Sequence, residues 1–242
     1  MPVGFLFSRY FLVHLWTLSG LALSMGGLFA LFHGRHDLAA RLIFFPIVID
    51  FTDGTLARRF RVKERIPLVS GESIDMITDV VSLTFVPLVF FWKMGVFLPY
   101  AGIPICVLAA MTCSLKYSMK ENVLRQGYSL GSTPIFFTVF LFYFLGLDPL
   151  WPTLYTAVLI VLCLAPIQYP ITSLVTTHWK FGWKSLTNYG TFIVFIPIMI
   201  WLEDTWPPLL WFMLLVILFQ LYLYPILMKV GILVKPGFDR SR

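Results

Sequence analysis

Charged residues are scarce in this sequence. Asp, Glu, Lys and Arg together make up 12% of the 242 residues, about half the share of ordinary globular proteins. A soluble chain with so little charge and 59% apolar residues would expose large apolar patches and aggregate. The shortage of charge therefore excludes an ordinary soluble domain, and an aromatic content of 17% excludes a disordered chain.

Cysteines, repeats and low-complexity segments are also few or missing. Cys106, Cys113 and Cys163 all lie within apolar runs, which excludes a disulfide scaffold. A nucleic-acid partner would need a basic face on a soluble domain, and the sequence offers none. What the sequence does have is apolar runs of helix length rather than ten-residue alternations, which predicts helices and not a barrel. We therefore expect an all-α integral membrane protein.

Apolar segments long enough to cross a bilayer occur throughout the chain. They predict a bundle of about eight transmembrane helices that forms a single membrane domain over residues 1–242. The first segment differs from a signal peptide because its apolar run is too long and no small-residue cleavage site follows, so it is expected to be retained. The predicted segments are 11–32, 37–57, 72–92, 97–117, 132–147, 151–169, 188–203 and 208–228.

Lys and Arg are distributed unevenly between the joins of these segments. If the N-terminus is cytoplasmic, the crossings return the C-terminus to the cytoplasm, and all but three of the 18 Lys and Arg residues face that side. The three on the other side are Arg35, Arg41 and Lys93. This asymmetry predicts that both termini are cytoplasmic, in a bacterial inner membrane, and the net charge of +6 is mostly a sign of topology.

Four carboxylates interrupt the second and third segments. Each would cost roughly 2.5–3.5 kcal/mol at the centre of a bilayer. Asp50 and Asp53 share one helix face at i and i+3, and Asp75 and Asp79 share another at i and i+4. Because the segments are consecutive and joined by a short loop, they are expected to be antiparallel neighbours. The four carboxylates are therefore predicted to face one another near the cytoplasmic ends of both helices.

Facing carboxylates repel one another unless cations lie between them. Hard oxygen ligands suit Mg²⁺ or Mn²⁺, and no combination of Cys and His suggests zinc. Two such ions usually serve phosphoryl chemistry. Small residues on the same faces (Gly54, Ala57 and Gly71) would leave room for a bulky ligand, and Arg58 would offer a cation to phosphate.

These residues resemble the signature of the CDP-alcohol phosphatidyltransferases, which is Asp-Gly-x₂-Ala-Arg, a spacer, and Gly-x₃-Asp-x₃-Asp. The matching residues are Asp53, Gly54, Ala57, Arg58, Gly71, Asp75 and Asp79, with Asp50 as an upstream Asp that many members carry. Twelve residues separate Arg58 from Gly71, which is longer than in most members and is similar to bacterial phosphatidylcholine synthases. The likeness is strongest over residues 9–92.

The resemblance implies an enzyme that transfers the phosphatidyl group of CDP-diacylglycerol to a small alcohol and releases CMP. It implies that the four Asp residues bind two Mn²⁺ or Mg²⁺ ions, with Asp79 nearest to the acceptor as the general base. It also implies that the nucleotide is held by Asp53, Gly54, Ala57, Arg58, Gly71 and Asp75. The enzyme would work in the lipid bilayer, and a homodimer is compatible with the resemblance.

Choline is the favoured acceptor, while serine, inositol and glycerol phosphate stay open. Aromatic faces and a carboxylate hold a quaternary ammonium best, which makes Glu72, Tyr117 and Tyr189 candidate acceptor residues. The stretch after Tyr128 lacks the Trp-Asn pair that phosphatidylcholine synthases usually carry there. A polyol phosphate would instead favour the cations at Lys116, Lys120 and Arg125.

Two other classes compete with an enzyme, namely a cation-coupled transporter and a catalytically inactive scaffold. Transporters place such charges near the midplane on broken helices, often in two repeated halves. Here the Asp residues are predicted on two unbroken helices near one surface, and the chain has no repeat. His14 is interpreted as a packed, hydrogen-bonded residue, and Thr17 and Ser19 as contacts between helices.

Overall fold

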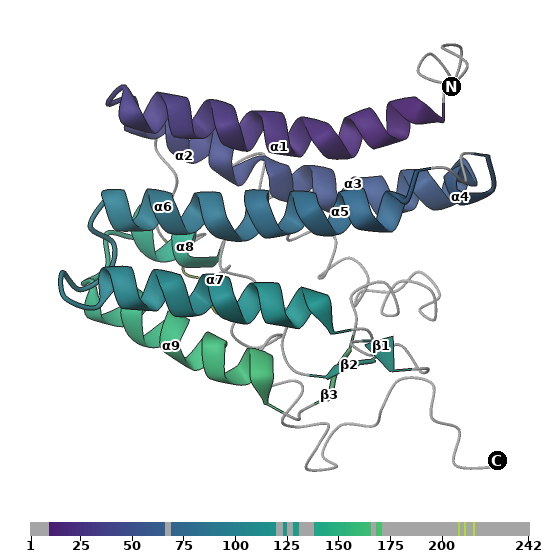
Figure 1. The fold of residues 1–242 in the computed structure, drawn as a ribbon. Coiled ribbons are helices and arrows are strands. Elements are labelled where there is room, and N and C mark those ends of the chain that lie inside the picture. The colour runs from purple at the N-terminus through teal and green to yellow at the C-terminus, as the bar shows by residue number, and fades with distance from the viewer. Residues whose placement is uncertain are drawn as a thin grey trace. The chain divides into compact units, whose positions relative to one another are not determined.

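The structure is a computed structural model, and it describes residues 10–65, 69–119, 123–124, 128–130, 138–165, 168–170, 208, 211 and 215 (Figure 1). Most of these residues are helical, as the sequence predicts. The chain divides into two compact units, Met1–Met94 and Gly95–Arg242, which we describe separately. Apart from 208, 211 and 215, the predicted spans 188–203 and 208–228 lie outside the described residues, so the predicted helix number stays a prediction.

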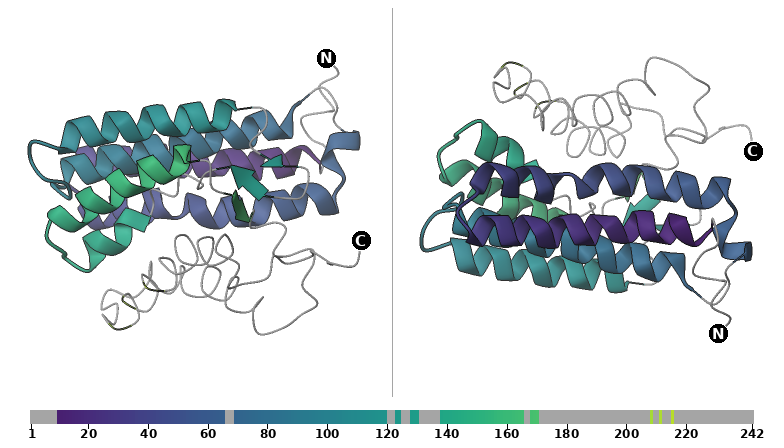
Figure 2. Two further views of the ribbon diagram at one scale, coloured as in Figure 1. Left: turned by 90° about the horizontal axis from the view of Figure 1, so that it is seen from below. Right: turned by 90° about the horizontal axis from the view of Figure 1, so that it is seen from above.

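The first unit is a layer of long helices. It contains α1 (Phe11–Phe32), α2 (His36–Phe44), α3 (Pro46–Arg59), α4 (Val62–Arg65), α5 (Gly71–Asp79) and α6 (Val86–Lys93). A π-helical segment, η2 (Val80–Phe85), joins α5 to α6 without a break. Helix α1 lies alongside α2 and α3 and also alongside α5 and α6 (Figures 1 and 2).

Contacts along α1 give the direction of its neighbours. The indole nitrogen of Trp16 donates to the hydroxyl of Thr52 at 2.9 Å. Farther along α1, Gly27 lies against Ile43. Residue numbers rise on α1 while they fall on its neighbours, so α1 is antiparallel to α2 and α3. Helix α5 is parallel to α1. His14 lies beside Gly71 and Gly20 beside Thr78, so residue numbers rise together on the two helices.

The second predicted span is two helices rather than one. Helix α2 ends at Phe44 and α3 begins at Pro46, with Phe45 between them. Proline has no N–H to donate, and its ring clashes with the carbonyl of the preceding turn, so it begins a helix more easily than it continues one. The prediction of an unbroken second helix was therefore wrong, although Asp50 and Asp53 both lie within the uninterrupted α3.

Two helical stretches are long and apolar enough to cross a membrane in the described part of the chain. They are Phe11–Phe32 with 22 residues and Gly71–Lys93 with 23 residues, close to the predicted bounds of 11–32 and 72–92. At 1.5 Å per residue, each is about 33 Å long, which matches the hydrocarbon core of a bilayer. Helices α7 (Gly102–Ser118) and α9 (Leu150–Leu164) are apolar but shorter.

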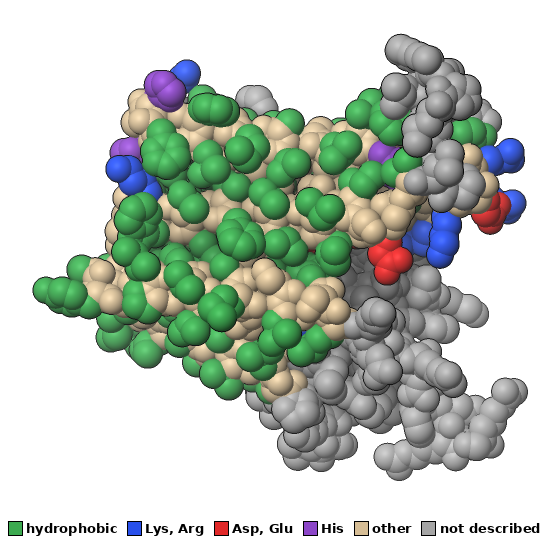
Figure 3. Space-filling view, in the orientation of Figure 1, with side chains coloured by type: hydrophobic (Ala, Val, Ile, Leu, Met, Phe, Trp, Pro, Cys, Tyr) green, Lys and Arg blue, Asp and Glu red, His purple; other side chains and the backbone are tan. Residues whose placement is uncertain are grey.

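The surface of the first unit separates apolar from charged side chains. Hydrophobic side chains cover the visible face of its helices, and charged ones gather at the two ends (Figure 3). Large apolar side chains such as Phe29 and Trp92 are exposed on this unit. One end carries the exposed basic residues of 58–65, and the other carries the exposed turn 33–37. An apolar band between two polar ends is the arrangement expected of a bilayer-spanning unit.

The second unit pairs α7 with α9 and includes the short helix α8 (Val139–Phe144). The backbone N–H of Leu98 donates to the hydroxyl of Thr153 at 3.0 Å. The hydroxyls of Thr138 and Tyr155 lie 2.5 Å apart and are buried. These polar contacts join separate segments of an apolar unit. Because buried polar groups in such surroundings have no water to bond, each needs its protein partner, and this fixes the register of the helices.

Three short strands depart from the predicted all-α fold. β1 (Val123–Leu124), β2 (Tyr128–Leu130) and β3 (Gln168–Pro170) form an antiparallel sheet in the order β1-β2-β3. The sixth predicted span, 151–169, runs into β3. Helix α9 ends at Leu164 because Ala165 precedes a proline and is extended, with φ −67° and ψ 141°. A residue before proline disfavours the helical conformation, so the span is shorter than its hydropathy suggests.

Candidate functional site

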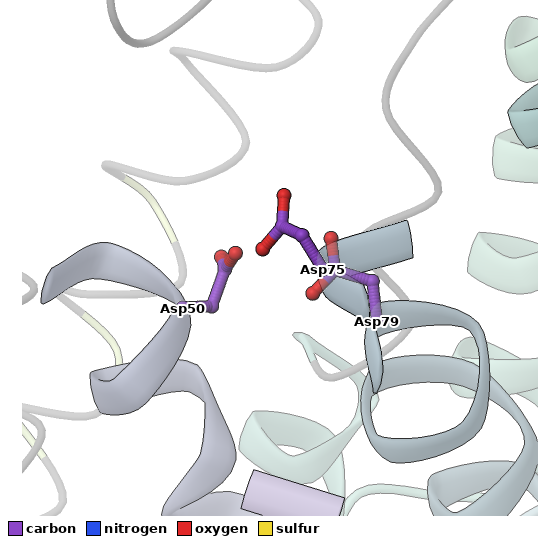
Figure 4. Close-up of side chains that lie close together, drawn as sticks. All are labelled: Asp50, Asp75 and Asp79. Carbon is purple, nitrogen blue, oxygen red and sulfur yellow. The ribbon is translucent and has the colours of Figure 1, made fainter. Parts of the chain in front are cut away.

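Three carboxylates from two helices meet at one point of the first unit. Asp50 comes from α3, and Asp75 and Asp79 come from successive turns of α5. One carboxylate oxygen from each lies within 4.8 Å of the other two. Their carboxylates point toward one another across the space between the helices (Figure 4). The structure thus brings together three of the four Asp residues that the sequence singles out, and we call Asp50, Asp75 and Asp79 the carboxylate cluster.

Asp53 lies beside this cluster and is linked to it. It is one turn after Asp50 on α3, and only 5% of its surface is exposed. Its carboxylate interacts with the side chain of Asp75 and with the hydroxyl of Thr17 on α1. The neighbouring charges on Asp50 are those of Asp53 and Asp75. All four predicted carboxylates therefore belong to one network.

Such a network is electrostatically unfavourable by itself. Two unit charges about 5 Å apart repel by roughly 3 kcal/mol at an effective dielectric constant of about 20. The carboxylates are partly or fully buried, so water screens them less than it would at a surface. The pairs Asp50–Asp79 and Asp53–Asp75 lie within hydrogen-bonding reach. A shared proton or a bound cation must therefore offset the repulsion.

The remaining signature residues of α3 lie toward its last turn. Ala57 is half-buried and Arg58 is exposed. The guanidinium of Arg58 folds back along the helix toward Gly54. A methyl group on Gly54 would lie 3.5 Å from one of the guanidinium nitrogens. A cation is thus held one turn away from Asp53, on the helix that carries two of the carboxylates. This is a suitable place to meet the charge of a phosphate.

Gly71 begins α5, and its nearest neighbour is a side chain of α1. A methyl group on Gly71 would lie 3.1 Å from Cε1 of His14. The ring of His14 is 4% exposed and also meets the ring of Phe11 edge-on. His14 is packed, as expected, but the expectation that it is hydrogen-bonded was wrong for Nε2, which has no hydrogen-bond partner among the described residues. Sequence spacing gives no sign of this contact because 57 positions separate the two residues.

The candidate acceptor residues are distributed over different parts of the chain. Glu72 is exposed in the first turn of α5, and its charge acts on Asp75. Tyr117 is half-buried near the end of α7 in the second unit. Tyr189 lies outside the described residues. Of the three, Glu72 belongs to the unit that holds the carboxylate cluster.

Sequence reasoning missed several buried polar groups on the helices of the first unit. The hydroxyls of Ser24, Thr78 and Ser82 are buried and have no hydrogen-bond partner in the described structure. Thr78 sits between Asp75 and Asp79 in sequence, on the side of α5 that faces Gly20 of α1. Thr17 is expected to join helices; its hydroxyl interacts with Asp53 of α3 and also makes a long bond of 3.4 Å to the carbonyl of Val13 within α1. Ser19, in contrast, donates to the carbonyl of Trp16 at 2.6 Å within its own helix.

Comparison with known proteins identifies the family of this arrangement. The sequence model of the CDP-alcohol phosphatidyltransferases matches residues 11–178, which include the carboxylate network and both signature glycines. The chain belongs to the CDP-alcohol phosphatidyltransferase family. The family is membrane-associated, in agreement with the two long apolar stretches of the first unit.

Similar proteins in several bacteria are named phosphatidylcholine synthases. The protein of Borreliella burgdorferi is 32% identical over 121 residues, which is 50% of this chain and 51% of that protein. The protein of Bradyrhizobium diazoefficiens is 30% identical over 191 residues, or 76% of this chain and 68% of that protein. The protein of Pseudomonas aeruginosa is 29% identical, with 61% and 62% covered. The matches thus span from half to about two thirds of these relatives.

The donor set of the site fits the divalent ion on which the family generally depends. Oxygens bound to one Mg²⁺ at 2.0–2.1 Å lie roughly 3–4 Å apart, and Mn²⁺ accepts a similar set of oxygens. The oxygens of the carboxylate cluster lie within 4.8 Å of one another, so a small adjustment of side chains would bring them to this spacing. All donors in the cluster are hard carboxylate oxygens, which disfavour a soft metal.

Proposed function

We propose that this chain is a CDP-diacylglycerol-dependent phosphatidyltransferase that makes phosphatidylcholine. The observation that carries the proposal is the meeting of Asp50, Asp75 and Asp79, from two helices, within 4.8 Å. Family membership and the names of the relatives support the same reaction. The acceptor is choline in this proposal, because the similar proteins quoted above are named for its product.

Each residue of the site has a proposed role. Asp50, Asp53, Asp75 and Asp79 would hold two divalent ions, which neutralise phosphate charge when bound. Arg58 would pair with the diphosphate, since its guanidinium lies over Gly54 on the same helix. Gly54, Ala57 and Gly71 would form the wall along which the nucleotide lies, because they present little or no side chain.

The proposed reaction is a single displacement at phosphorus. The hydroxyl oxygen of choline attacks the lipid-side phosphorus of CDP-diacylglycerol, and the bond from that phosphorus to the bridging oxygen breaks. CMP leaves with the bridging oxygen and its electron pair. Asp79 accepts the hydroxyl proton of choline, as a general base within reach of the attacking oxygen. Positioning and charge neutralisation supply most of the acceleration in such chemistry.

The membrane arrangement is part of the same proposal. We infer one polytopic domain of about eight helices, with both termini and the site on the cytoplasmic side of a bacterial inner membrane. The basic run at 58–65 is exposed at the end of the first unit where α3 ends and α5 begins, which the positive-inside rule assigns to the cytoplasm. Single cysteines placed at residue 63 and at residue 35 would be labelled from opposite sides of sealed vesicles, and labelling from the same side would contradict this topology.

The decisive measurement is CMP release by the purified full chain from CDP-diacylglycerol. Choline, serine, inositol and glycerol 3-phosphate are tested separately with Mn²⁺ or Mg²⁺, and then again after chelation of the metal. The proposal expects release with choline and its loss on chelation. Release with another acceptor alone would overturn choline while keeping the chemistry.

The matched control concerns the alternative acceptor class. Replacing Lys120 and Arg125 with Gln removes cations that a polyol phosphate would need, and turnover with choline should stay within about twofold of the wild type, because a choline cation gains nothing from them. Absence of CMP release with every acceptor would contradict the enzyme itself. Cation-dependent uptake into liposomes would then favour a transporter.

A further inference from the structure

His14 of α1 and Gly71 of α5 fit together as a pair one turn before Asp75. The ring atom Cε1 of His14 lies 3.1 Å from where a Cβ of Gly71 would stand, and Nδ1 lies 3.8 Å from it. The first separation is tighter than ordinary van der Waals contact, and the second is ordinary contact. The missing side chain of Gly71 therefore leaves a notch that the outer edge of the His14 ring occupies.

Packing, and not hydrogen bonding, holds the Nε2 edge of this ring. His14 is 4% exposed, and within the part of the chain that the structure describes its Nε2 is buried without a hydrogen-bond partner. The ring meets the ring of Phe11 edge-on at a centroid distance of 6.3 Å, and its Cε1 atom lies against Gly71. A ring held in this way transmits any change at residue 71 directly to α1.

Helix α5 connects this contact to the carboxylates. The side chain of Ser70 caps the helix by accepting from the N–H of Ser73 at 3.2 Å, so its first turn is well formed. Asp75 and Asp79 follow Gly71 by one and two turns, which places them about 6 and 12 Å farther along a stiff helix. A displacement of the first turn would therefore shift both carboxylates.

Helix α1 also contacts the other carboxylate helix. Thr17 follows His14 by three residues on the same side of α1. Its hydroxyl makes a long bond of 3.4 Å to the carbonyl of Val13 in its own helix, and it also interacts with the carboxylate of Asp53 on α3. The same helix thus touches α5 through His14 and α3 through Thr17. The spacing between the carboxylates of α3 and those of α5 depends on both contacts.

We propose that His14 is a positioning residue for phosphatidyl transfer, and that Gly71 lacks a side chain in order to admit its ring. The inference rests on the proposed function. A Cβ on Gly71 would point at His14. Gly71 therefore has a packing role that does not depend on substrate reaching its backbone. His14 acts through α5 and sets the separation of Asp75 and Asp79 from Asp50.

A double substitution tests the pair. Gly71→Ala should lower kcat roughly tenfold or more, because displacements below 1 Å at a metal site are costly. His14→Asn removes Cε1 and Nε2 and keeps the part of the side chain that makes ordinary contact. His14→Asn alone should also lower kcat, but by less than Gly71→Ala, because the ring no longer sets the spacing while nothing pushes α5 away. In Gly71→Ala/His14→Asn, kcat should rise to within about threefold of the His14→Asn value, while the KM for choline changes less than twofold in all three variants.

Gly20→Ala is the matched control. It adds the same methyl group to the same interface, but its nearest neighbour would be Thr78 Cγ2 at 3.5 Å, which is ordinary contact. Its kcat should equal that of the wild type. The proposal is overturned if Gly71→Ala behaves like Gly20→Ala. It is equally overturned if the double variant is as inactive as Gly71→Ala, because Gly71 would then serve the ligand and not His14.

A second readout separates this inference from the proposed function. Mn²⁺ affinity, measured by electron paramagnetic resonance on the full chain in nanodiscs, should fall most in Gly71→Ala and should rise to the level of His14→Asn in the double variant. Thermal unfolding of the same samples shows that each variant is folded. If the wild type releases no CMP, the proposed function fails while this Mn²⁺ comparison still decides the role of the pair. If Mn²⁺ affinity is the same in all variants, positioning of the cluster is wrong.

Discussion

The two halves of α1 make different kinds of contact. In the first half, His14 and Thr17 reach α5 and Asp53 through polar side chains. In the second half, Gly27 lies against Ile43 and Ala39 of α2, and these neighbours are fully buried. The same helix is therefore joined to α2 by apolar close packing at one end. At the other end it packs a polar ring against Gly71 of the carboxylate helix α5 and brings a hydroxyl to Asp53. We expect substitutions in the first half to change turnover, and substitutions in the second half to change stability.

The largest effect is expected at the carboxylate network itself. Asp79→Asn removes the proposed base and a metal ligand while preserving shape, so kcat should fall by about 10³-fold or more. Removal of one negative charge from a crowded cluster should leave the unfolding temperature unchanged or raise it. CMP release and thermal unfolding of the same preparation measure both quantities.

Asp37→Asn is the matched control for this prediction. Asp37 is exposed in the first turn of α2, at the opposite end of the first unit. Its substitution should change neither quantity. If Asp79→Asn keeps more than a tenth of the wild-type kcat, Asp79 is not the base.

The second-largest effect should be on stability, at Gly27. A methyl group there would overlap Cγ1 of Ile43 and would lie 3.2 Å from the backbone nitrogen of Ile43. Overpacking of this kind typically costs about 1–3 kcal/mol of unfolding free energy. Gly27→Ala should therefore lower the unfolding temperature while the folded fraction turns over normally.

Gly26→Ala provides the comparison for Gly27. Its methyl group would meet Leu42 Cδ1 at 3.8 Å, which is ordinary contact, so stability should stay the same or rise slightly. The contrast between the two halves of α1 would be lost if Gly27→Ala lowered kcat instead of the unfolding temperature.

Thr17 should give a smaller effect, and it lies in the half that serves turnover. Thr17→Val keeps the shape of the side chain and removes the hydroxyl that reaches Asp53. A hydrogen bond to a charged group contributes about 1.5–3 kcal/mol, so Mn²⁺ affinity and kcat/KM should fall roughly tenfold or more. Thr17→Ser keeps the hydroxyl and should restore most of the loss. Equal losses in both variants would point to the methyl group and to packing.

The sequence was sufficient for the parts of this molecule that depend on local pattern. Apolar runs located the two long helical stretches, and i, i+3 and i, i+4 spacing placed Asp50, Asp75 and Asp79 on facing sides of their helices. Pro46 itself indicates the break between α2 and α3, but the apolar run around it is long enough for one span and was interpreted as a single helix. Hydropathy measures burial in lipid and not backbone continuity.

Contacts between distant residues were beyond the sequence. The pairing of His14 with Gly71, and of Thr17 with Asp53, depends on how α1 is rotated against two other helices. The rotation of α1 is fixed by packing along its whole length, including Gly20 and Gly27, and no single spacing reveals it. The small residues of α1 indicate close helix packing, but they do not identify the polar residue that lies opposite each one.

The smallest predicted effect is a gain in unfolding free energy, and it concerns Ser24, which lies between the two halves of α1. Ser24 is fully buried on α1, and its hydroxyl has no hydrogen-bond partner in the described part of the chain. A buried unpaired hydroxyl costs about 1–3 kcal/mol, so Ser24→Ala should raise the unfolding free energy by about 0.5–1 kcal/mol after allowance for the small gap it leaves. Thr153→Val is the opposite case, because its hydroxyl accepts from Leu98 N–H and donates to the carbonyl of Pro149, so it should destabilise the fold. If Ser24→Ala also destabilises, the packing lost at this position outweighs the release of an unpaired hydroxyl, and the prediction is wrong.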